Sequence, residues 1–320
     1  MTVTEPTALV LGTSQVNVSC NGGSDGSVNL TVSGGTASYT YAWDNGQTTE
    51  DISGLISGDY KITVTDAKNC TANKTVTITQ PDVLNGSAIA TAVTCNGGTN
   101  GGVTLTVSGG TSGFTYLWSN AATTKDISDV PAGLYSVTIT DSKNCKAIVT
   151  ATVTEPSEIS ATGAVKNVKC FGLATGEIDL TVSGGTPGYT YSWAASNGGS
   201  VPLIQENNQD LTGLIAGTYT VTITDSKSCT KALSFNITQP ASALSLSTVK
   251  TDILCNGNND GSINLSVTGG TSPFTYNWGG GITTSNRSSL AAGNYSVDVT
   301  DANSCMATTS VTINQPDILT

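Results

Sequence analysis

The sequence contains no histidine among its 320 residues, and only 11% of its residues carry a charge. Histidine is the usual general base and a common metal ligand, so its absence removes the ordinary zinc sites and the Ser-His and Cys-His catalytic arrangements. No pair of carboxylates stands apart from a pattern that recurs along the whole chain, so acid and base catalysis also lacks its usual groups. The sequence therefore predicts a protein that is not an enzyme and has no cofactor.

Basic residues and long apolar runs are scarce as well. The chain has 12 Lys and Arg against 23 Asp and Glu, a net charge of −11, which argues against nucleic acid or an anionic membrane as a partner. No apolar run approaches the length of a membrane span, and Met1 precedes Thr-Val-Thr-Glu-Pro rather than a signal segment. Residues Thr2 to Pro6 match Thr152 to Pro156. We expect residues 1–6 to be the remnant of a preceding repeat, with the export signal outside this piece.

What the chain has is a strand-like stretch that occurs four times, beginning at Gly58, Gly133, Gly217 and Gly293. In each copy a tyrosine and two β-branched residues alternate with polar ones, as in Tyr60-Lys-Ile-Thr-Val, which is the period of a strand with one buried face. Each copy continues into Thr-Asp, a short polar turn and one cysteine. The repetition means that any structure or function proposed for one copy applies to four.

The cysteines also mark the repeats. Cys20, Cys95, Cys170 and Cys255 follow one another at intervals of 75, 75 and 85 residues. We predict four tandem domains at residues 1–81, 82–156, 157–240 and 241–320. A domain of this size is close to the lower limit at which one core stabilises itself, so covalent support is expected.

The eight cysteines fall two to a repeat, and none forms a C-x-x-C motif. We therefore predict one disulfide within each repeat: Cys20 with Cys70, Cys95 with Cys145, Cys170 with Cys229, and Cys255 with Cys305. A loop of about 50 residues closed in this way adds about 4 kcal/mol by the chain-entropy estimate. Such bonds persist in oxidising surroundings, so the protein should be secreted or displayed on the cell surface. The alternative is four pairs of buried free thiols in a cytosolic protein.

Within one repeat, short alternating stretches are separated by turn signals, and no stretch has a helical period. A tryptophan on the third stretch and a Gly-x-Tyr at the start of the next-to-last predict an immunoglobulin-like β-sandwich of six or seven strands. The first cysteine lies in the turn before the second strand and the other in the final hairpin turn. We expect the disulfide to staple one end of the sandwich.

Several motifs together resemble the SprB repeat, which is found in tandem in giant surface adhesins of gliding bacteria. They are Cys-Asn-Gly-Gly-x-Asp-Gly-Ser, Ser-Gly-Gly-Thr, Tyr-x-Trp, Ala-Gly-x-Tyr-x-Val-x-Val-Thr-Asp and the closing Thr-Ile-Thr-Gln-Pro. The third repeat departs from them with Cys170-Phe171-Gly172 and about nine extra residues between Trp193 and Leu214. The resemblance implies a cell-surface protein exported by the type IX secretion route, anchored outside the outer membrane and moved by the gliding machinery.

Three groups of residues are candidates for binding. Most aromatics occupy four equivalent slots in each repeat, which favours core packing over a sugar-binding platform; Phe171 is the one unique candidate for exposed stacking, and Phe235 aligns with the inward Val76. The glycine doublets, such as Gly34-Gly35, lead into strands and are predicted to be tight turns with positive φ rather than phosphate loops.

The four aspartates that follow the recurrent strand are Asp66, Asp141, Asp225 and Asp301. We expect each to accept amide hydrogen bonds in an Asx-turn before the cysteine. The alternative is a structural Ca²⁺ ligand with Asp25 or Asp260 nearby, although Asn100 and Thr175 replace these in the other repeats.

We expect these repeats to form a structural stalk, in which each repeat contacts its neighbours in the chain and other parts of the parent protein contact surface polysaccharide or the gliding machinery. The alternative is that the repeats themselves bind carbohydrate or another surface, through polar strand faces or the loop from Ala194 to Gln209. Deleting the extra residues of that loop should leave folding nearly untouched. Seven strands would put the two termini of a domain at opposite ends, so four domains in line should reach roughly 140 to 160 Å.

Overall fold

The computed structural model describes residues 5–318, so most of the predicted remnant at residues 1–6 lies outside the described part. Across residues 5–318 the chain forms strands and turns and contains no helix. A helix able to cross a membrane is accordingly not found in that range. The chain divides into two compact units, Met1–Glu155 and Pro156–Thr320, and each contains two of the predicted repeats.

Each repeat contains six strands, at the lower of the two expected numbers. Repeat 1 has β1 (Val10–Val16), β2 (Gly26–Ser33), β3 (Thr40–Trp43), β4 (Ile52–Leu55), β5 (Gly58–Thr65) and β6 (Thr71–Ile78). Repeat 2 has β7 (Asn85–Thr91), β8 (Gly101–Ser108), β9 (Thr115–Trp118), β10 (Ile127–Val130), β11 (Gly133–Thr140) and β12 (Lys146–Val153). Repeat 3 has β13 (Ser160–Lys166), β14 (Gly176–Ser183), β15 (Thr190–Ser196), β16 (Leu211–Leu214), β17 (Gly217–Thr224) and β18 (Thr230–Ile237). Repeat 4 has β19 (Ser245–Thr251), β20 (Gly261–Thr268), β21 (Thr275–Asn277), β22 (Arg287–Leu290), β23 (Gly293–Thr300) and β24 (Met306–Ile313).

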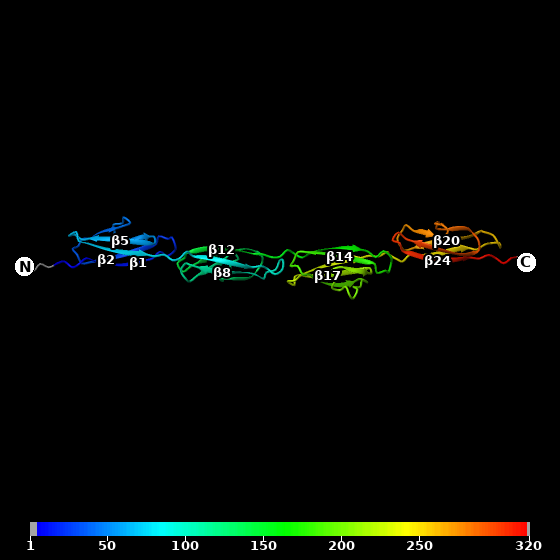
Figure 1. Cartoon of the computed structure of the whole chain (residues 1–320), viewed down its shortest axis with the longest axis horizontal. Coiled ribbons are helices and arrows are strands. Elements are labelled where there is room, and N and C mark those ends of the chain that lie inside the picture. The colour runs from blue at the N-terminus through cyan, green and yellow to red at the C-terminus, as the bar shows by residue number, and fades with distance from the viewer. Residues whose placement is uncertain (1–4, 319–320) are drawn as a thin grey trace, which may run out of the picture. The chain divides into compact units, whose positions relative to one another are not determined.

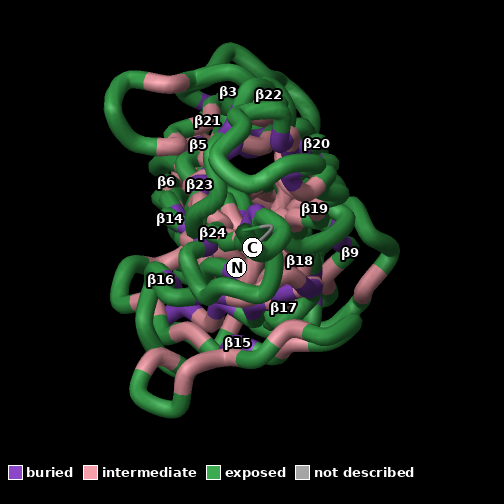
Figure 2. The backbone as a smooth tube through the Cα atoms, turned by 90° about the vertical axis from the view of Figure 1, so that its right-hand side faces the viewer, coloured by how far each residue is buried: buried purple, intermediate pink, exposed green. Residues whose placement is uncertain are grey.

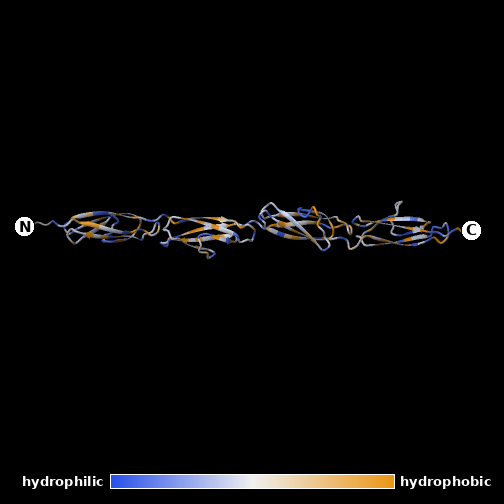
Figure 3. Cartoon of the chain, turned by 90° about the horizontal axis from the view of Figure 1, so that it is seen from below, coloured by the Kyte–Doolittle hydropathy of each residue, from blue (hydrophilic) through white to orange (hydrophobic). Residues whose placement is uncertain are grey.

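The six strands form two antiparallel sheets of three. In repeat 1 the sheets have the orders β1-β2-β4 and β3-β5-β6, and the other three repeats have the same orders. Figure 1 shows β5 in one layer of repeat 1 and β1 and β2 in the other. Buried positions occur within the strands while the turns are mostly exposed (Figure 2), and polar and apolar residues are interspersed along the strands (Figure 3). This is the period of two that the sequence predicts for half-buried strands.

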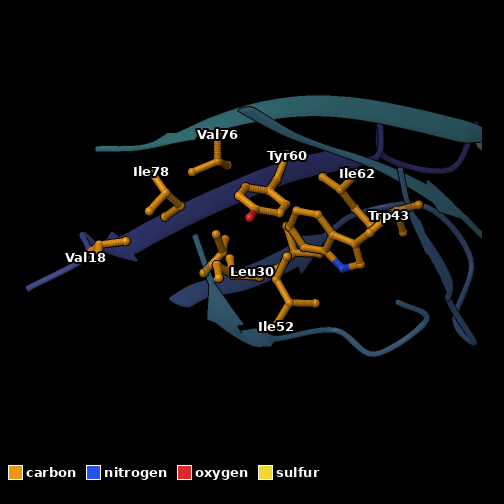
Figure 4. Close-up of a cluster of buried hydrophobic side chains, with 11 residues drawn as sticks. Val18, Leu30, Trp43, Ile52, Tyr60, Ile62, Val76 and Ile78 are labelled. Carbon is orange, nitrogen blue, oxygen red and sulfur yellow. The ribbon is translucent and has the colours of Figure 1, made fainter. Parts of the chain in front are cut away.

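The core lies between the two sheets. In repeat 1, Trp43, Tyr60 and Ile62 from one sheet pack against Leu30 and Ile52 from the other (Figure 4), and all five are buried. The Tyr60 hydroxyl donates to the carbonyl four residues earlier, at Ile56 (3.0 Å). This tyrosine corner recurs in the other repeats and is a hallmark of immunoglobulin-like sandwiches, so the predicted fold class is confirmed.

The direction of the strands gives each repeat two distinct ends. The Val18 amide, just after β1, donates to the Thr79 carbonyl, just after β6, so β1 and β6 end side by side and run the same way. β3 and β6 are both antiparallel to β5, and β1 and β4 are both antiparallel to β2. β3 and β4 therefore run in the same direction and act as one strand that is interrupted where the chain changes sheets. The six strands therefore carry the chain along the length of the sandwich five times, with β3 and β4 counted as one passage. Because five is an odd number, the chain leaves a repeat at the end opposite to the one where it enters. We call these the entry end, with the β5–β6 hairpin, and the exit end, with the β1–β2 loop.

Repeats 3 and 4 differ from the first two inside the core. In repeat 3, Phe235 is paired with Tyr219 as Val76 is with Tyr60, which confirms its inward position, and its ring packs against Trp193. A Cβ added at Gly163 would lie 2.4 Å from that ring, so this glycine makes the room that the phenylalanine needs.

In repeat 4, Arg287 occupies the β22 position that is Ile52 in repeat 1. Its guanidinium lies over the rings of Trp278 (5.7 Å) and Tyr295 (5.4 Å). Both aromatics are only half-buried, and the core divides into two clusters, unlike the single cluster of each other repeat. A cation thus fills the place of an aliphatic side chain, at a cost in apolar packing.

Candidate functional site: the joints between repeats

The exit end of each repeat holds the segment that leads to the next repeat. In repeat 1, the Asn21 side chain donates to the Pro81 carbonyl (2.9 Å) and the Gly22 amide donates to the Gln80 side chain (2.7 Å). Both contacts recur in repeat 4, from Asn256 to Pro316 and from Gly257 to Gln315. The closing Gln-Pro is therefore fastened to the loop that carries the first cysteine, which makes the start of the connection to the next repeat stiff.

The loop with the first cysteine is closed by a side-chain oxygen. Asp25 accepts the amide hydrogen of Ser19 (2.9 Å), and Asn100 accepts that of Thr94 (3.0 Å). An aspartate, an asparagine or a threonine can supply the one acceptor that the loop needs. This explains why Asn100 and Thr175 stand where repeats 1 and 4 have aspartates.

The entry end of each repeat is built on the buried aspartate. Asp66 Oδ1 accepts the amides of Lys68 and Cys70, both at 2.8 Å, and Oδ2 accepts the amide of Thr36 (2.9 Å). The hydrogen bonds from Thr36 and Cys70 hold the pKa of Asp66 below its ordinary value, against the opposing effect of burial. Asp141, Asp225 and Asp301 have the same three kinds of partner, so the predicted Asx-turn role is confirmed in all four repeats.

The cysteines connect different repeats. Cys20 of repeat 1 is bonded to Cys145 of repeat 2, with Cα atoms 5.7 Å apart, and Cys170 of repeat 3 is bonded to Cys305 of repeat 4, with Cα atoms 5.6 Å apart. Every one of the four predicted pairs contains one of these cysteines, so the predicted bonds Cys20–Cys70, Cys95–Cys145, Cys170–Cys229 and Cys255–Cys305 are all wrong. The expectation of one disulfide inside each domain is also wrong, because these bonds join two domains.

The prediction failed because it placed both cysteines of a repeat at one end. Cys20 lies in the β1–β2 loop at the exit end, and Cys70 lies after the β5–β6 hairpin turn at the entry end. The length of the sandwich separates them. Since the exit end of one repeat joins the entry end of the next, the first cysteine of repeat 1 meets the second cysteine of repeat 2.

Each joint has polar contacts beside the bond. Lys143 of repeat 2 contributes to lowering the pKa of Asp25 in repeat 1, although the hydrogen bonds from Ser19 are the larger cause. In the other unit, the Asn303 side chain of repeat 4 donates to the Lys169 carbonyl of repeat 3 (3.0 Å). The two repeats of each unit are thus connected by a Gln-Pro linker (Gln80-Pro81 or Gln239-Pro240), a disulfide and side-chain interactions.

A cavity of about 340 Å³ lies at the joint of repeats 3 and 4. Phe171, Leu173 and Met306 supply apolar lining, and the disulfide between Cys170 and Cys305 borders it. Phe171, the one unique candidate for exposed stacking, is 44% exposed at this place. Its ring sits beside the joint, and its use as a stacking surface stays a prediction.

The other aromatics and the glycine doublets are structural. Trp43, Trp118 and Trp193 are buried, and each indole N–H donates to a backbone carbonyl. All eight glycines of the doublets have positive φ, as predicted. Added Cβ atoms at Gly34 and Gly109 would lie 2.0 Å from the carbonyl oxygens of Ala8 and Val83. These doublets therefore let the entering chain lie against the turn.

The predicted calcium alternative stays untested. Among residues 5–318 no group of three or more His, Cys, Asp or Glu is placed to hold a metal ion. The calcium alternative combines Asp66 with Asp25, but the two carboxylates accept hydrogen bonds at opposite ends of repeat 1, Asp66 at the entry end and Asp25 at the exit end. Both carboxylate oxygens of Asp66 already accept amide hydrogens.

The long loop of repeat 3 has two parts. Its first residues extend β15 to Ser196, and the Ser200 amide donates to the hydroxyl of the fully buried Tyr219 (3.3 Å). Farther on, Leu203 and Ile204 are 88% and 89% exposed. The first part covers the core, and the second presents an apolar tip to solvent. That deletion of the extra loop residues leaves folding nearly untouched stays a prediction, and it applies best to the exposed tip at Leu203 and Ile204.

Sequence reasoning missed one recurrent hydrogen bond, which fastens the residue before the fourth strand to the second strand of the same sheet. Asp51 accepts the amide of Leu30 (2.9 Å), and Asp126, Asp210 and Asn286 accept the equivalent leucine amides. The signal was present as an Asp or Asn directly before each fourth strand. It closes the connection that carries the chain from β3 to β4.

Comparison with known proteins identifies the repeat. The family model of the SprB repeat matches the chain four times, at residues 12–48, 87–123, 162–198 and 247–283. In repeat 1 the match runs from β1 through β3 and ends before β4, so the recurrent Gly-x-Tyr strand lies outside it. No curated protein matches the chain.

Solved structures also match the chain, and two of them serve as examples. The N-terminal eight Ig domains of Down Syndrome Cell Adhesion Molecule match with 8% identity and a TM-score of 0.38, covering 98% of this chain and 61% of that one. Invasin, a bacterial integrin-binding protein, matches with 11% identity and a TM-score of 0.32, covering 96% and 79%. This chain therefore spans about three fifths of the length of the first of these structures.

Proposed function

Because this chain carries four repeats of the SprB family in tandem, we propose that it is a stalk segment of a large extracellular adhesin. The finer proposal is that the parent protein is a gliding-motility adhesin, exported by type IX secretion and held at the outer membrane. The stalk role is non-enzymatic: the repeats hold an adhesive or force-coupled part away from the cell. Disulfide bonds agree with the oxidising surroundings outside the cell.

The observation that carries the stalk proposal is the path of the covalent chain through the joints. Cys20 and Cys145 are 125 positions apart, and Cys170 and Cys305 are 135 apart. Tension applied along the backbone passes through each bond and bypasses the residues between its cysteines. Domain unfolding therefore cannot lengthen the chain by those residues while the bonds stay intact. A tether so built keeps its length under load.

Single-molecule stretching between the two termini tests this proposal. An unfolded loop of 125 residues would add about 430 Å at full extension. The oxidised protein should show no extension from the loop between Cys20 and Cys145, whereas Cys145→Ser should release it. Equal extension in the two proteins would contradict the tether. Scattering in solution provides the second test, because four repeats in line should reach roughly 140 to 160 Å.

A second candidate function is attachment through the repeats themselves, to carbohydrate or to another surface. The exposed pair Leu203 and Ile204 in the long loop of repeat 3 favours this alternative, and an aliphatic tip fits an apolar protein surface better than a sugar. A glycan array and a cell-surface binding assay, each with Leu203→Ser/Ile204→Ser as the matched variant, distinguish the ligands. Loss of binding in the variant supports attachment by the loop.

A further inference from the structure

Two exposed cysteines, Cys70 in repeat 1 and Cys255 in repeat 4, are free. They occupy different ends of their repeats. Cys70 follows the entry-end hairpin, as Cys145 and Cys305 do, and Cys255 lies in an exit-end loop, as Cys20 and Cys170 do. These four equivalent cysteines, Cys20, Cys145, Cys170 and Cys305, form the disulfides between the two repeats of each unit.

We propose that Cys255 and Cys70 each form a disulfide with another SprB repeat, Cys255 with an entry end and Cys70 with an exit end. We call the exit end around Cys255 and the entry end around Cys70 half-joints, because each supplies one side of such a joint. The partner of Cys255 is the hairpin cysteine of a further repeat, and the partner of Cys70 is the loop cysteine of one. A second copy of this chain carries both, so it is the partner that tests the idea. The inference rests on the joint geometry and stands apart from the stalk proposal.

The loop around Cys255 makes the same two hydrogen bonds to the closing Gln-Pro as the loop around the bonded Cys20. Asn256 holds the Pro316 carbonyl (2.8 Å) and Gly257 holds the Gln315 side chain (3.1 Å), as Asn21 and Gly22 hold their partners beside the bonded Cys20. The bonded joints also bring the hairpin sulfur to the carbonyl just before the loop cysteine. The distances are 3.4 Å from Cys145 Sγ to the Ser19 oxygen and 3.5 Å from Cys305 Sγ to the Lys169 oxygen.

Leu254 occupies this position before Cys255 and is 78% exposed. In the first joint the equivalent residue is Ser19, against which the hairpin of the next repeat lies. Docking of another hairpin here would bring its sulfur beside the Leu254 carbonyl. The exposed leucine thus marks the surface that the incoming repeat would cover.

The entry-end half-joint is also formed before any partner binds. Asp66 accepts the amide of Cys70 (2.8 Å), as Asp141 accepts that of Cys145 (2.9 Å). The residue before the cysteine is left-handed in both hairpins, with φ of 63° at Asn69 and 66° at Asn144. The backbone therefore presents Cys70 as it presents the bonded Cys145, and little ordering is required when the bond forms.

Oxidised glutathione supplies the oxidant for the bond. The Cys255 thiolate attacks it, which forms a mixed disulfide and releases one glutathione thiolate. The Cys70 thiolate of a second copy then attacks the Cys255 sulfur and releases the other. Two protein thiols lose their protons and become one disulfide, and one oxidised glutathione becomes two reduced molecules.

The experiment mixes two variants of the full chain in a glutathione redox buffer. Cys70→Ser retains the free Cys255, and Cys255→Ser retains the free Cys70. We expect the mixture to form a covalent dimer at least about tenfold faster than either variant alone, with a Cys255–Cys70 bond by peptide mapping. The unaltered chain should form a ladder of longer species, and Cys70→Ser/Cys255→Ser should stay monomeric.

A matched control separates docking from simple exposure of a thiol. Lys61 is exposed on β5, away from the hairpin turn, so Cys70→Ser/Cys255→Ser/Lys61→Cys offers an accessible thiol at the wrong place. It should react with Cys70→Ser far more slowly than Cys255→Ser does. Equal rates, homodimers formed as fast as the mixed dimer, or a Cys70–Cys255 bond within one monomer would each overturn the proposal.

Discussion

Cys20 and Cys145 are separated by 125 positions and belong to different repeats, yet their Cα atoms lie 5.7 Å apart in a disulfide. The bond restrains two domains at once. If repeat 1 unfolds alone, its residues from Cys20 to the linker at Pro81 form a loop closed through folded repeat 2. If repeat 2 unfolds alone, its residues up to Cys145 form a similar loop closed through repeat 1.

We therefore expect Cys145→Ser to destabilise both repeats 1 and 2. Each loop contains about 60 residues, for which the chain-entropy estimate is about 4 kcal/mol as an upper value. Hydrogen exchange with peptide resolution measures the stability of each repeat separately, and repeats 3 and 4 provide the internal control. A loss limited to repeat 2 would indicate a bond within that repeat and contradict the cross-repeat pairing.

Gly163 and Phe235 form a pair that a double-mutant cycle can test. Gly163→Ala places a methyl group against the phenyl ring, so it should destabilise repeat 3 by about 1 to 3 kcal/mol. Phe235→Val restores the residue of repeat 1 and should remove most of that cost in the double variant, because it takes away the clashing ring. Urea denaturation measures the four proteins. Additive losses would show that the glycine has another role.

Arg287 makes the core of repeat 4 the least apolar of the four. Arg287→Ile, which introduces the residue of repeats 1 and 2, should stabilise repeat 4 by about 1 kcal/mol because it buries more of Trp278 and Tyr295. Arg287→Ala should destabilise it, since both the cation–π contacts and the covering side-chain stem are lost. Calorimetry resolves the melting of the repeat. A lower melting temperature for Arg287→Ile than for Arg287→Ala would show that the cation matters more than the packing.

The buried aspartates should make the protein sensitive to acid. The pKa of Asp66 is lowered in the folded state, chiefly by the amide hydrogen bonds from Thr36 and Cys70, so its stabilising effect is complete above the unfolded pKa of about 4. That effect is lost as the pH falls through the folded pKa, which lies below this value. Asp66→Asn should therefore lose stability at pH 7 and show a weaker dependence on pH below 4.

Urea denaturation of repeat 1 between pH 7 and pH 2 checks this expectation. Asp44→Asn is the control, because Asp44 is an exposed turn residue. An Asp66→Asn variant with the same acid dependence as the unaltered chain would show that the hairpin carboxylate is not the group that responds.

Local periodicity and turn chemistry were sufficient to predict much of each repeat. The alternation around Tyr60 and Ile62 predicts a strand with one buried face, because successive side chains point to opposite sides of a strand. Positive φ at Gly34 and Gly35, and amide capping by Asp66, follow from the properties of a few consecutive residues. Such features depend on neighbours in the chain, so the sequence by itself determined them.

The pairing of the cysteines depended on something that no short stretch contains. Two cysteines in every repeat indicate disulfides, and they do not indicate which ones meet. That was decided by β3 and β4 running in the same direction, which puts Cys20 and Cys70 at opposite ends and turns a bond within a repeat into one between repeats. Strand direction across two sheets is a property of the packed sandwich, because it arises only when the strands meet to bury their shared core.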